Sequence, residues 1–431
     1  MSTDTSFTRI KSCLLALLKK KWFIGVGGLA VAFAAGILAC QLGAALQEGL
    51  DLHPAQIGWA MSLARLLVER NDLDPARVDD VICGCVHQVG AQAYNLGRNS
   101  VLAAGWPEAV PATTIDRQCG SSQQALHFAA QGVIAGAYDV AVAMGVEVMS
   151  LVPLGSSIVR QFGDPFAGGV AERYADRETF GVRGLIPQGI SAELLAERWN
   201  LSREDLDAFG LRSQDRAAAA RDAGRFDDEL VDLPAIRLDA ETGERIVTGD
   251  LVTSDGGIRP TTAEALAGLR PAFLPDGRIT AGTSSQIADG AAAVLVMDED
   301  LAAAEGFAPL ARVTSFAIAG DDPVAMLSAP IPATRRILER AGLGVDDIDL
   351  FEINEAFASV VLGWQRELGV DPDRVNVNGG AIALGHPLGA SGARLTATLV
   401  HELRRSGGRR GLQTMCEGGG MANATIVESL A

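Results

Sequence analysis

The feature that most constrains the fold is a repeated order of strands and helices in the two halves of the chain. Residues 301–431 predict strands at 309–318, 348–353, 374–378, 411–416 and 422–429, with helices at 332–342, 355–367 and 389–405. The preceding half predicts a comparable series, with helices at 55–70 and 120–136, strands at 81–86 and 140–148, and a strand or buried helix at 288–297. A reactive residue lies at a strand-to-helix junction in each half, Cys119 in one and His386 in the other. Duplicated α/β halves are expected to bring these two junctions together at one interface.

Length, charge and cysteine usage narrow the class of protein. A chain of 431 residues exceeds the needs of one core, and 48% hydrophobic residues with 49 glycines are typical of a soluble α/β enzyme. The formal net charge of −17 argues against nucleic acid as a partner, because no basic stripe is available to neutralise phosphates. Six cysteines without regular spacing fit a reducing compartment. Cys83 and Cys85 alternate along a strand and are predicted to be buried thiols, not metal ligands, so we expect no metal site.

We divide the chain into three segments. Residues 1–49 are an atypical apolar segment, 50–300 form the first half, and 301–431 form the second half. The more polar residues 151–280 contain a helix pair near 190–199 and 203–222 and are interpreted as an inserted loop domain that shapes a binding site. The acidic run 298–300 is interpreted as a hinge between the halves.

The N-terminal segment carries an uncharged run from Trp22 to Leu46, preceded by Lys19, Lys20 and Lys21. Its length and composition meet the criterion for a membrane-spanning helix, and the pattern also resembles a signal peptide. The alternative is a buried, strand-like opening of the fold. Export would expose the thiols of the chain to oxidation. We therefore expect a cytoplasmic protein, with membrane association through 22–46 as the alternative.

A glycine-dense run at 376–394 holds His386 in the sequence Gly385-His386-Pro387. Glycines let the backbone come close to a bound group, and the imidazole can take a thiol proton or donate to a developing oxyanion. A tight structural turn is the alternative for the run by itself. Cys119 precedes Gly-Ser-Ser at a predicted helix start, where unpaired N–H groups and the helix dipole favour a thiolate. The alternative for Cys119 is a core cysteine at the start of a helix.

Three further motifs complete the candidate site. Asn354 follows a buried strand, where its amide could orient a water, hold an oxyanion or cap the helix expected at 355–367. Phe357 is expected to line the acyl or pantetheine channel. Cys416 lies at a strand end before a glycine turn and suits acid–base work, since a thiol can move a proton either way. The N–H of Gly418 is a candidate oxyanion donor.

These motifs resemble the thiolase family, the acetyl-CoA acetyltransferases and 3-ketoacyl-CoA thiolases, from about residue 50 to residue 431. The motifs that carry the resemblance are Cys119-Gly-Ser-Ser, Asn354-Glu-Ala-Phe, Gly385-His386-Pro and Cys416-Glu-Gly. The resemblance implies a duplicated five-layer αβαβα fold, dimers or tetramers, and ping-pong acyl transfer. Cys119 would be the acylated nucleophile, His386 its activator and Cys416 the acid–base at the α-carbon. One oxyanion hole would combine a water on Asn354 with His386, and the other would combine the N–H groups of Cys119 and Gly418.

The same resemblance assigns the substrate-binding residues. Ser285 in the loop 279–290 takes the position of a pantetheine contact, while Arg259 and the segment from Leu269 to Phe273 match nucleotide-side contacts. It implies coenzyme A and acyl-CoA as substrates, with no bound cofactor. The Thr-Ser-Ser-Gln variant of that loop is similar to actinobacterial degradative thiolases, including steroid side-chain ones.

Two other functions are weighed against this interpretation. A decarboxylating ketoacyl synthase of similar fold would need a second histidine or a His–Asn pair around the cysteine, and no second turn-placed histidine is found in the sequence. A membrane-tethered acyl-CoA-binding protein with a vestigial site would explain the apolar N-terminus. The intact set of four motifs argues against it.

Overall fold

The computed structural model describes residues 55–158, 163–238 and 245–430. In the first half, β1 (Asp80–Gly84), β2 (Ala112–Ile115), β3 (Val140–Val148) and β8 (Asp289–Met297) form a sheet in the order β2-β1-β3-β8. β1 runs parallel to β2 and β3, and β8 is antiparallel to β3. Every residue of β3 is buried, as expected for a strand covered by helices on both faces of its sheet.

The second half also contains a four-stranded mixed sheet. Its sheet has the order β10-β11-β12-β9, built from β9 (Ala311–Gly320), β10 (Leu350–Ile353), β11 (Arg410–Glu417) and β12 (Met421–Ser429). β10 and β11 are parallel, and β12 is antiparallel to its two neighbours. The strand predicted at 374–378 is wrong, because only one bridge joins Val375 to Phe351. Asn376 takes a left-handed φ of 48°, which turns the chain away from the sheet edge.

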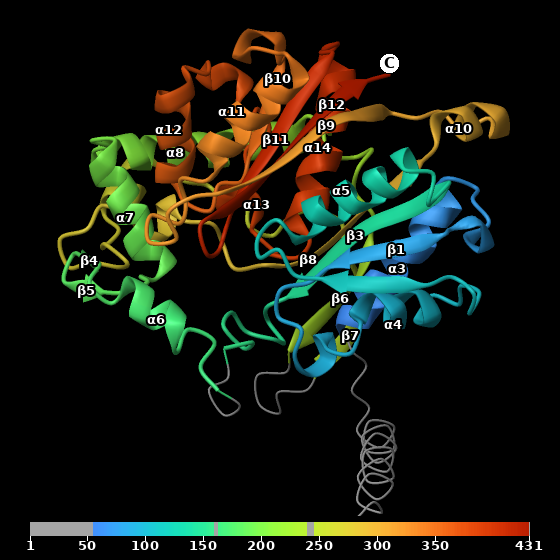
Figure 1. Cartoon of the computed structure of the whole chain (residues 1–431), viewed down its shortest axis with the longest axis horizontal. Helices are drawn as coiled ribbons and strands as arrows, with labels where there is room; N and C mark the ends of the chain where they lie inside the picture. The colour runs from blue at the N-terminus through green and yellow to red at the C-terminus, as the bar shows by residue number, and fades with distance from the viewer. Residues whose placement is uncertain (1–54, 159–162, 239–244, 431) are drawn as a thin grey trace, which may run out of the picture. The chain divides into compact units, whose positions relative to one another are not determined.

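Helices separate and cover the two sheets in five layers (Figure 1). α3 (Ala55–Arg70) and α4 (Leu96–Ala103) pack on the outer face of the first sheet, and α11 (Pro330–Ala341) packs on the outer face of the second, with α12 (Ala358–Leu368) beside it. α5 (Ser121–Ile134) and α14 (Ser391–Ser406) pack against each other and contact strands of both sheets. The predicted duplicated αβαβα fold is therefore confirmed, and α5 and α14 form its central layer.

The segment between the antiparallel neighbours β3 and β8 holds most of the remaining elements. Its predicted helix pair is confirmed as α7 (Gln188–Arg198) and α8 (Arg203–Asp222), and α8 begins with a capping box between Ser202 and Asp205. The other elements there are α6 (Gly169–Tyr174), β4 (Glu178–Thr179), β5 (Val182–Arg183), β6 (Leu233–Leu238), β7 (Arg245–Val252) and α9 (Ala263–Ala267). The boundaries of a loop domain at 151–280 stay a prediction.

Short elements complete the connections. The acidic run 298–300 starts α10 (Glu299–Glu305), because Asp298 caps that helix by accepting the N–H of Leu301 at 3.0 Å. The interpretation of this run as a simple hinge is therefore wrong. The remaining short helices are α13 (Ala381–Leu384) and the 3-10 turns Pro75–Arg77, Gly90–Gln92, Ala281–Thr283, Val345–Asp347 and Pro372–Arg374.

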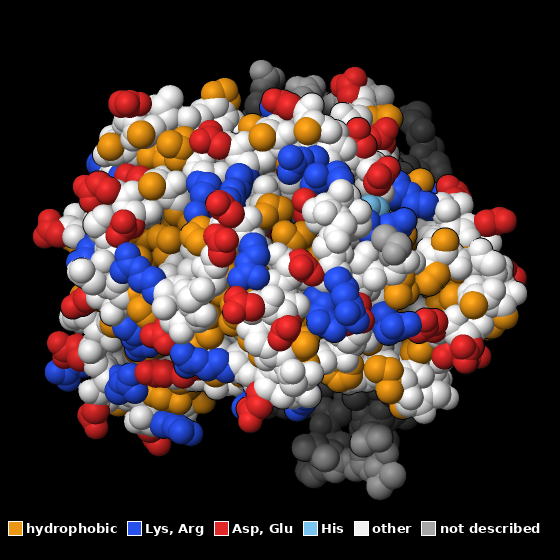
Figure 2. Space-filling model, turned by 90° about the horizontal axis from the view of Figure 1, so that it is seen from above, with side chains coloured by type: hydrophobic (Ala, Val, Ile, Leu, Met, Phe, Trp, Pro, Cys, Tyr) orange, Lys and Arg blue, Asp and Glu red, His pale blue; other side chains and the backbone are white. Residues whose placement is uncertain are grey.

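The possible membrane segment at 22–46 lies outside the described residues. Within 55–158, 163–238 and 245–430, no helix has the length and apolar character that crossing a bilayer requires. Basic and acidic side chains alternate over the face shown in Figure 2, without a large area of one sign. All lysines of the sequence precede Trp22, so the basic side chains of the described residues are arginines.

Candidate active site

Cys119 lies in a tight turn between β2 and α5. Asp116 Oδ1 accepts the N–H of Gln118 at 2.6 Å, and Ser121 Oγ accepts the N–H of Arg117 at 2.9 Å. Gln118 itself has a left-handed φ of 48°, a conformation that a residue with a side chain rarely adopts. The turn places Cys119 immediately before Gly120, the N-cap of α5, as predicted.

Burial changes the expected state of the Cys119 thiol. The side chain is 5% exposed, and burial, followed by the nearby Glu417 carboxyl, raises the pKa of Cys119 to about 12. The N–H groups of Cys119 and Gly418 both act in the opposite direction by hydrogen bonding to the sulfur. The expectation of a resting thiolate from the helix start is therefore wrong, because desolvation outweighs these donors. The thiol needs a base before it can react.

Cys416 is a second buried thiol close to Cys119. It lies on β11 opposite Ala422 and is 1% exposed. Burial, the charge of Cys119 and that of Glu417 raise its pKa well above the ordinary value. Gly418 follows two residues later, and its backbone N–H reaches the Cys119 sulfur. Cys119, Cys416 and Gly418 are thus brought together from the two halves, as the sequence predicted.

His386 and Asn354 form a buried pair. Asn354 Nδ2 lies 3.2 Å from His386 Nε2, and the other ring nitrogen, Nδ1, lies 2.6 Å from Ser391 Oγ. Ser391 Oγ also donates to Pro387 O at 2.9 Å, so its remaining role toward Nδ1 is that of an acceptor. This assigns the proton to Nδ1 and makes Nε2 the acceptor of the hydrogen bond from Asn354 Nδ2.

The same surroundings keep the imidazole uncharged. His386 is 4% exposed, and burial, with the positive charge of Arg394 as a second cause, lowers its pKa to about 3. The resting ring is therefore uncharged near neutral pH, and Nε2 is the nitrogen that could receive a proton during a reaction. Asn354 is fully buried, and its Oδ1 has no hydrogen-bond partner among the described residues. That acceptor is satisfied if it binds a water molecule.

Asn354 does not cap a helix. α12 begins at Ala358 with Phe357 as its N-cap, three residues later than the capping alternative requires. The intervening Glu355 accepts hydrogen bonds from Ser213 Oγ at 2.6 Å and from Asn376 Nδ2 at 2.9 Å. These contacts hold the segment after β10 in a non-helical path and leave the Asn354 amide free for His386.

The His386 turn is anchored on both sides. Its own N–H donates to Gln286 O at 2.9 Å, and Gln286 Nε2 donates to Gly257 O at 2.9 Å and to Ile382 O at 2.8 Å. On the other side, the N–H of Ala393 donates to Ser122 Oγ at 2.9 Å. Ser122 belongs to the first turn of α5, directly after Cys119, so the two predicted junctions meet.

The predicted coenzyme A residues gather around the 280–286 loop. Ser285 donates its N–H to Ala356 O at 3.0 Å, and Ser284 forms a bridge with Phe357. The rings of Phe273 and Phe357 meet edge to face with centroids 5.8 Å apart. Phe357 is buried in the core, whereas Phe273 is 40% exposed.

The other two predicted contacts lie beside the same loop. Leu269 is 37% exposed and approaches Gly282, where an added Cβ would lie 2.9 Å from its Cδ1. Arg259 is exposed and donates its backbone N–H to Gln214 Oε1 at 3.1 Å. Gly257, two residues before Arg259, accepts a hydrogen bond from Gln286 Nε2. This bond connects the segment around Arg259 to the His386 turn.

Sequence reasoning missed three polar residues of the site. Glu417 is fully buried next to both thiols, and neither of its carboxyl oxygens has a hydrogen-bond partner among the described residues. Burial raises its pKa to about 8. Gln286 joins the substrate loop to the catalytic turn, and Glu147 contacts the same turn from β3. The signal for Glu147 was available, since it is the one charged residue within the apolar run 140–148.

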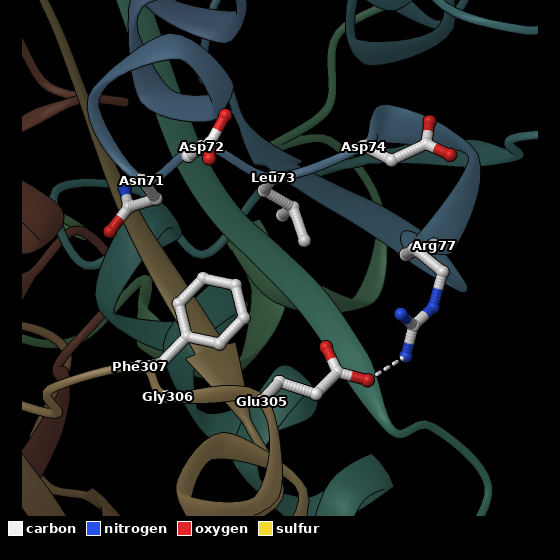
Figure 3. Close-up of a pocket in the computed structure, with 8 residues that line it drawn as sticks. All are labelled: Asn71, Asp72, Leu73, Asp74, Arg77, Glu305, Gly306 and Phe307. Carbon is white, nitrogen blue, oxygen red and sulfur yellow. Dashed lines mark hydrogen bonds and ion pairs between the residues drawn. The ribbon is translucent and has the colours of Figure 1, made fainter.

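A surface pocket lies away from these residues. It has a volume of about 370 Å³ and is lined by Asn71, Asp72, Leu73, Asp74, Arg77, Glu305, Gly306 and Phe307 (Figure 3). The ion pair between Arg77 and Glu305 spans 2.6 Å at its rim. The lining residues come from the segment before β1 and from the end of α10, which follows β8, whereas Cys119 follows the end of β2 and Asn354 follows the end of β10. The pocket therefore lies at the opposite ends of the strands of the first sheet, and its lining contains none of the candidate catalytic residues.

The fold and the site together define an enzyme that transfers acyl groups through a thiol. Comparison with known proteins agrees: residues 57–300 match the thiolase N-terminal domain and residues 307–429 match the thiolase C-terminal domain. The chain is 50% identical over 388 residues to the steroid 3-ketoacyl-CoA thiolase FadA6 of Mycobacterium tuberculosis, covering 88% of this chain and 89% of that protein. It is 44% identical over 353 residues to a 3-ketoacyl-CoA thiolase of Bacillus subtilis, covering 81% and 87%.

A solved structure shows the same likeness. The acetyl-CoA acetyltransferase of Bacillus anthracis superposes with a TM-score of 0.76 at 38% identity, covering 88% of this chain and 94% of that one. The chain therefore belongs to the thiolase family. It is a thiolase-type acyltransferase, and neither the synthase nor the vestigial binding protein is supported by these comparisons.

Proposed function

We propose that this enzyme cleaves 3-ketoacyl-CoA with coenzyme A through an acyl group held on Cys119, and that it runs the reverse Claisen condensation at the same site. The observation that carries the proposal is the convergence of two buried protonated thiols with a neutral imidazole. Cys119 and Cys416 have raised pKa values, while that of His386 is lowered to about 3. Thiolysis needs a base for one thiol and a proton donor in the other, and this arrangement supplies both.

The first half-reaction forms the acyl-enzyme. His386 Nε2 takes the proton of Cys119, and the sulfur attacks the 3-keto carbon of the substrate. The bond between C2 and C3 then breaks, and its electron pair remains on C2 of the departing acetyl-CoA. Cys416 gives its thiol proton to C2. The products are acetyl-CoA and acyl-Cys119, with a protonated His386 and a Cys416 thiolate left in the site.

The second half-reaction restores the resting site. Coenzyme A gives its thiol proton to the Cys416 thiolate, and the resulting coenzyme A thiolate attacks the acyl carbon on Cys119. The bond to the Cys119 sulfur breaks, and that sulfur recovers its proton from His386. Each group returns to its starting protonation state, so the cycle consumes only 3-ketoacyl-CoA and coenzyme A. The condensation direction follows the same steps in reverse.

Two sets of donors are placed to stabilise the oxyanions. The N–H groups of Cys119 and Gly418, which hydrogen bond to the Cys119 sulfur, are assigned to the oxygen of the acyl group bound there. A water on the unpartnered Oδ1 of Asn354, together with protonated His386, is assigned to the thioester oxygen of the second substrate.

The loop around Ser285 is assigned to coenzyme A. Phe273 and Leu269 supply exposed apolar surface beside Ser285, and Arg259 supplies an exposed cation for phosphate groups. Phe357 packs edge to face against the ring of Phe273 and is itself buried, so it supports this surface without forming part of it. We place the loop domain at about 151–280 within the first half at 50–300, and the second half at 301–431. No organic prosthetic group or metal takes part in this mechanism.

Trapping the acyl group tests the proposal. Incubation with acetoacetyl-CoA should add an acetyl mass to the peptide that contains Cys119, read by mass spectrometry. Cys416→Ser should retain acetylation of Cys119 by acetyl-CoA yet lose condensation, because only proton transfer at the α-carbon needs the second thiol. Cys119→Ser should lose both. An acyl mass found on Cys416 and never on Cys119 would reverse the assigned roles.

The substrate is best identified with a panel. FadA6 is named for steroid 3-ketoacyl-CoA, so ring-bearing 3-ketoacyl-CoA thioesters are the first to compare with acetoacetyl-CoA and linear medium chains. A higher kcat/KM for the ring-bearing thioester would assign the enzyme to ring degradation, and the opposite order would assign it to linear acyl chains.

We further propose a homodimer or homotetramer in the cytoplasm, where coenzyme A is present and both thiols stay reduced. Light scattering of the purified chain gives its oligomeric state, and a monomer would contradict that part. Cell fractionation with an alkaline wash tests location, and recovery in the washed membrane pellet would support the alternative of membrane association.

A further inference from the structure

A carboxylate outside the proposed reaction, Glu147, is fully buried near the C-terminal end of β3. Its neighbours along the strand are apolar or glycine, so the chain places one charge within an otherwise apolar strand. A buried carboxylate is costly unless several donors satisfy it. The contacts of Glu147 therefore indicate what the charge is for.

Five N–H donors converge on this carboxylate. Oε1 accepts from His87 N at 3.1 Å, His87 Nδ1 at 3.1 Å and Gln92 Nε2 at 3.0 Å. Oε2 accepts from Val86 N at 2.9 Å and from Gly389 N at 3.0 Å. Burial acts to raise the pKa of Glu147, yet the hydrogen bonds from His87 and Val86 outweigh it and hold that pKa below its usual value. The group is thus a fully paired carboxylate.

One of the five donors comes from the other half of the fold. Gly389 lies 242 residues from Glu147 in the sequence and three residues after His386. It also lies two residues before Ser391, the residue that accepts the Nδ1 proton of His386. The N–H of Gly389 is therefore fixed to the first half in the middle of the turn that orients the imidazole.

The carbonyl of Gly389 is fixed as well. A Cβ added to Gly145 on β3 would lie 2.0 Å from Gly389 O, and one added to Gly84 on β1 would lie 2.8 Å from it. The turn thus rests on two strands at positions where only glycine leaves room. Close packing against Gly145 and Gly84 limits how near Gly389 can come to the two strands. The hydrogen bond from Gly389 N to Glu147 Oε2 sets the orientation of that peptide group.

We propose that Glu147 is a positioning residue for catalysis, which fixes the His386 turn on the first half of the fold by accepting the N–H of Gly389. Glu147 does not touch the reacting atoms and acts through His386. The inference rests on the proposed thiolase reaction. It extends that reaction by naming the contact that keeps the base from the second half in register with the nucleophile from the first.

His87 gives the network a separable second branch. Its Nδ1 donates to Glu147, and its Nε2 accepts the N–H of Gly155 at 2.9 Å, which connects the carboxylate to the segment after β3. Replacing His87 leaves the contact between Glu147 and Gly389 in place. The two variants therefore separate loss of the turn contact from general loosening of the network.

The test compares Glu147→Gln, His87→Ala and a matched control. In Glu147→Gln an NH2 group replaces one carboxylate oxygen. Its N–H bonds then face the N–H donors that the oxygen accepted, so backbone donors are left unpaired. We expect kcat for thiolysis of acetoacetyl-CoA to fall about 10- to 100-fold, as for a loss of 1.4–2.7 kcal/mol of transition-state stabilisation, with KM for coenzyme A within about threefold. His87→Ala should lower this kcat by much less than Glu147→Gln does.

The control is Asp79→Asn, which changes a similar carboxylate at the opposite end of β3. Asp79 also accepts two backbone N–H groups, of Asp139 at 2.7 Å and Val140 at 3.0 Å.

A direct readout on the imidazole separates positioning from general damage. The chain has five histidines, so the ring resonances of His386 can be assigned by NMR with a His386→Gln reference. Glu147→Gln should shift or broaden the His386 resonances, while Asp79→Asn should leave them unchanged.

Several outcomes would overturn the proposal. A folded Glu147→Gln enzyme with wild-type kcat and an unchanged His386 spectrum would do so. A decrease in kcat in His87→Ala as large as that in Glu147→Gln would also do so. If Glu147→Gln does not fold, Glu147→Asp, which withdraws the charge by one methylene, must lower kcat at constant KM. An inactive wild-type enzyme would reject the proposed function itself, and the His386 spectrum would still decide whether Glu147 positions that ring.

Discussion

The carboxyl group of Glu417 faces Gly120 so closely that a Cβ added at position 120 would lie 2.1 Å from Glu417 Oε1. The residue preceding Gly120 is Cys119, and that preceding Glu417 is Cys416. An unpaired buried carboxyl therefore lies beside both reactive thiols. Its pKa of about 8 keeps it mostly protonated at neutral pH, and its ionisation at higher pH places a negative charge next to Cys119.

Glu417→Gln should make Cys119 more reactive in alkaline solution. The Glu417 charge is, after burial, the largest cause that raises the pKa of Cys119. Alkylation of Cys119 by iodoacetamide should therefore be several-fold faster in the variant above pH 8 and equal in both enzymes below pH 7, with the site confirmed by mass spectrometry. Glu229→Gln is the control, since Glu229 is another buried carboxyl with a pKa raised to about 8, but its charged neighbours do not include Cys119. Equal alkylation rates at pH 9 would contradict this.

The same substitution should change how stability depends on pH. Folding raises the pKa of Glu417 from the model-peptide value of 4.5 to about 8, so between these values the folded state holds a proton that the unfolded state has lost. This contribution is fully present below pH 4.5 and declines as pH rises through 8. Urea titrations at several pH values should show a less negative slope of the unfolding free energy for Glu417→Gln between pH 5 and 8. An unchanged slope would mean that Glu417 ionises normally.

The sequence anticipated the parts of the structure that local patterns determine. The strands at 140–148 and 422–429 and the helices near 55–70 and 203–222 have long periodic or apolar runs, and the structure contains them. Cys119 and His386 stood out because reactive side chains in tight glycine turns are chemically suggestive. Residues whose partners are remote were not accessible in this way. Glu147 receives Gly389 across 242 residues, and no local pattern encodes that contact.

Two errors have the same origin in tertiary structure. The helix start after Cys119 predicts a thiolate, yet burial by residues of the other half raises its pKa instead. The run after Asn354 is compatible with a helix, yet the contacts of Glu355 with Ser213 and Asn376 keep it extended until Ala358. In each case a long-range contact overrides a local preference that was assessed correctly.

Substitutions of Asn354 should separate its two roles. Asn354→Ala removes the Oδ1 that would hold a water, and losing an oxyanion donor lowers kcat by about 10²–10³. Asn354→Asp places a carboxylate beside His386 Nε2, which favours the imidazolium and raises the pKa of His386 above about 3. The acid limb of the kcat profile should therefore move to higher pH in Asn354→Asp and not in Asn354→Ala. Identical limbs in both variants would contradict the contact with Nε2.

Gln286 should control the approach of coenzyme A to the catalytic turn. Its Nε2 donates to carbonyl oxygens of Gly257 and Ile382, which tie the loop around Ser285 to the segment before His386. Gln286→Ala should raise KM for coenzyme A several-fold by releasing this loop. Gln286→Glu should raise this KM further, because a carboxylate would face the three carbonyl oxygens of Gly257, Ile382 and Ala383 without a donor. Steady-state kinetics with coenzyme A as the varied substrate checks the order, and a smaller effect of Gln286→Glu than of Gln286→Ala would reject the assignment.

Phe273 and Phe357 should give opposite results although their rings touch. Phe357 is 7% exposed and belongs to the core, so Phe357→Ala should lower the free energy of unfolding by about 3–5 kcal/mol. Phe273 is 40% exposed beside Ser285, so Phe273→Ala should cost much less stability and mainly raise KM for coenzyme A. Urea unfolding and steady-state kinetics on both variants, with Phe128→Ala as a control at another exposed phenylalanine on α5, separate the two effects. If Phe273→Ala left KM unchanged, the exposed ring would not contact coenzyme A, and the assignment of the loop surface would have to move to Leu269 and Ser285 alone.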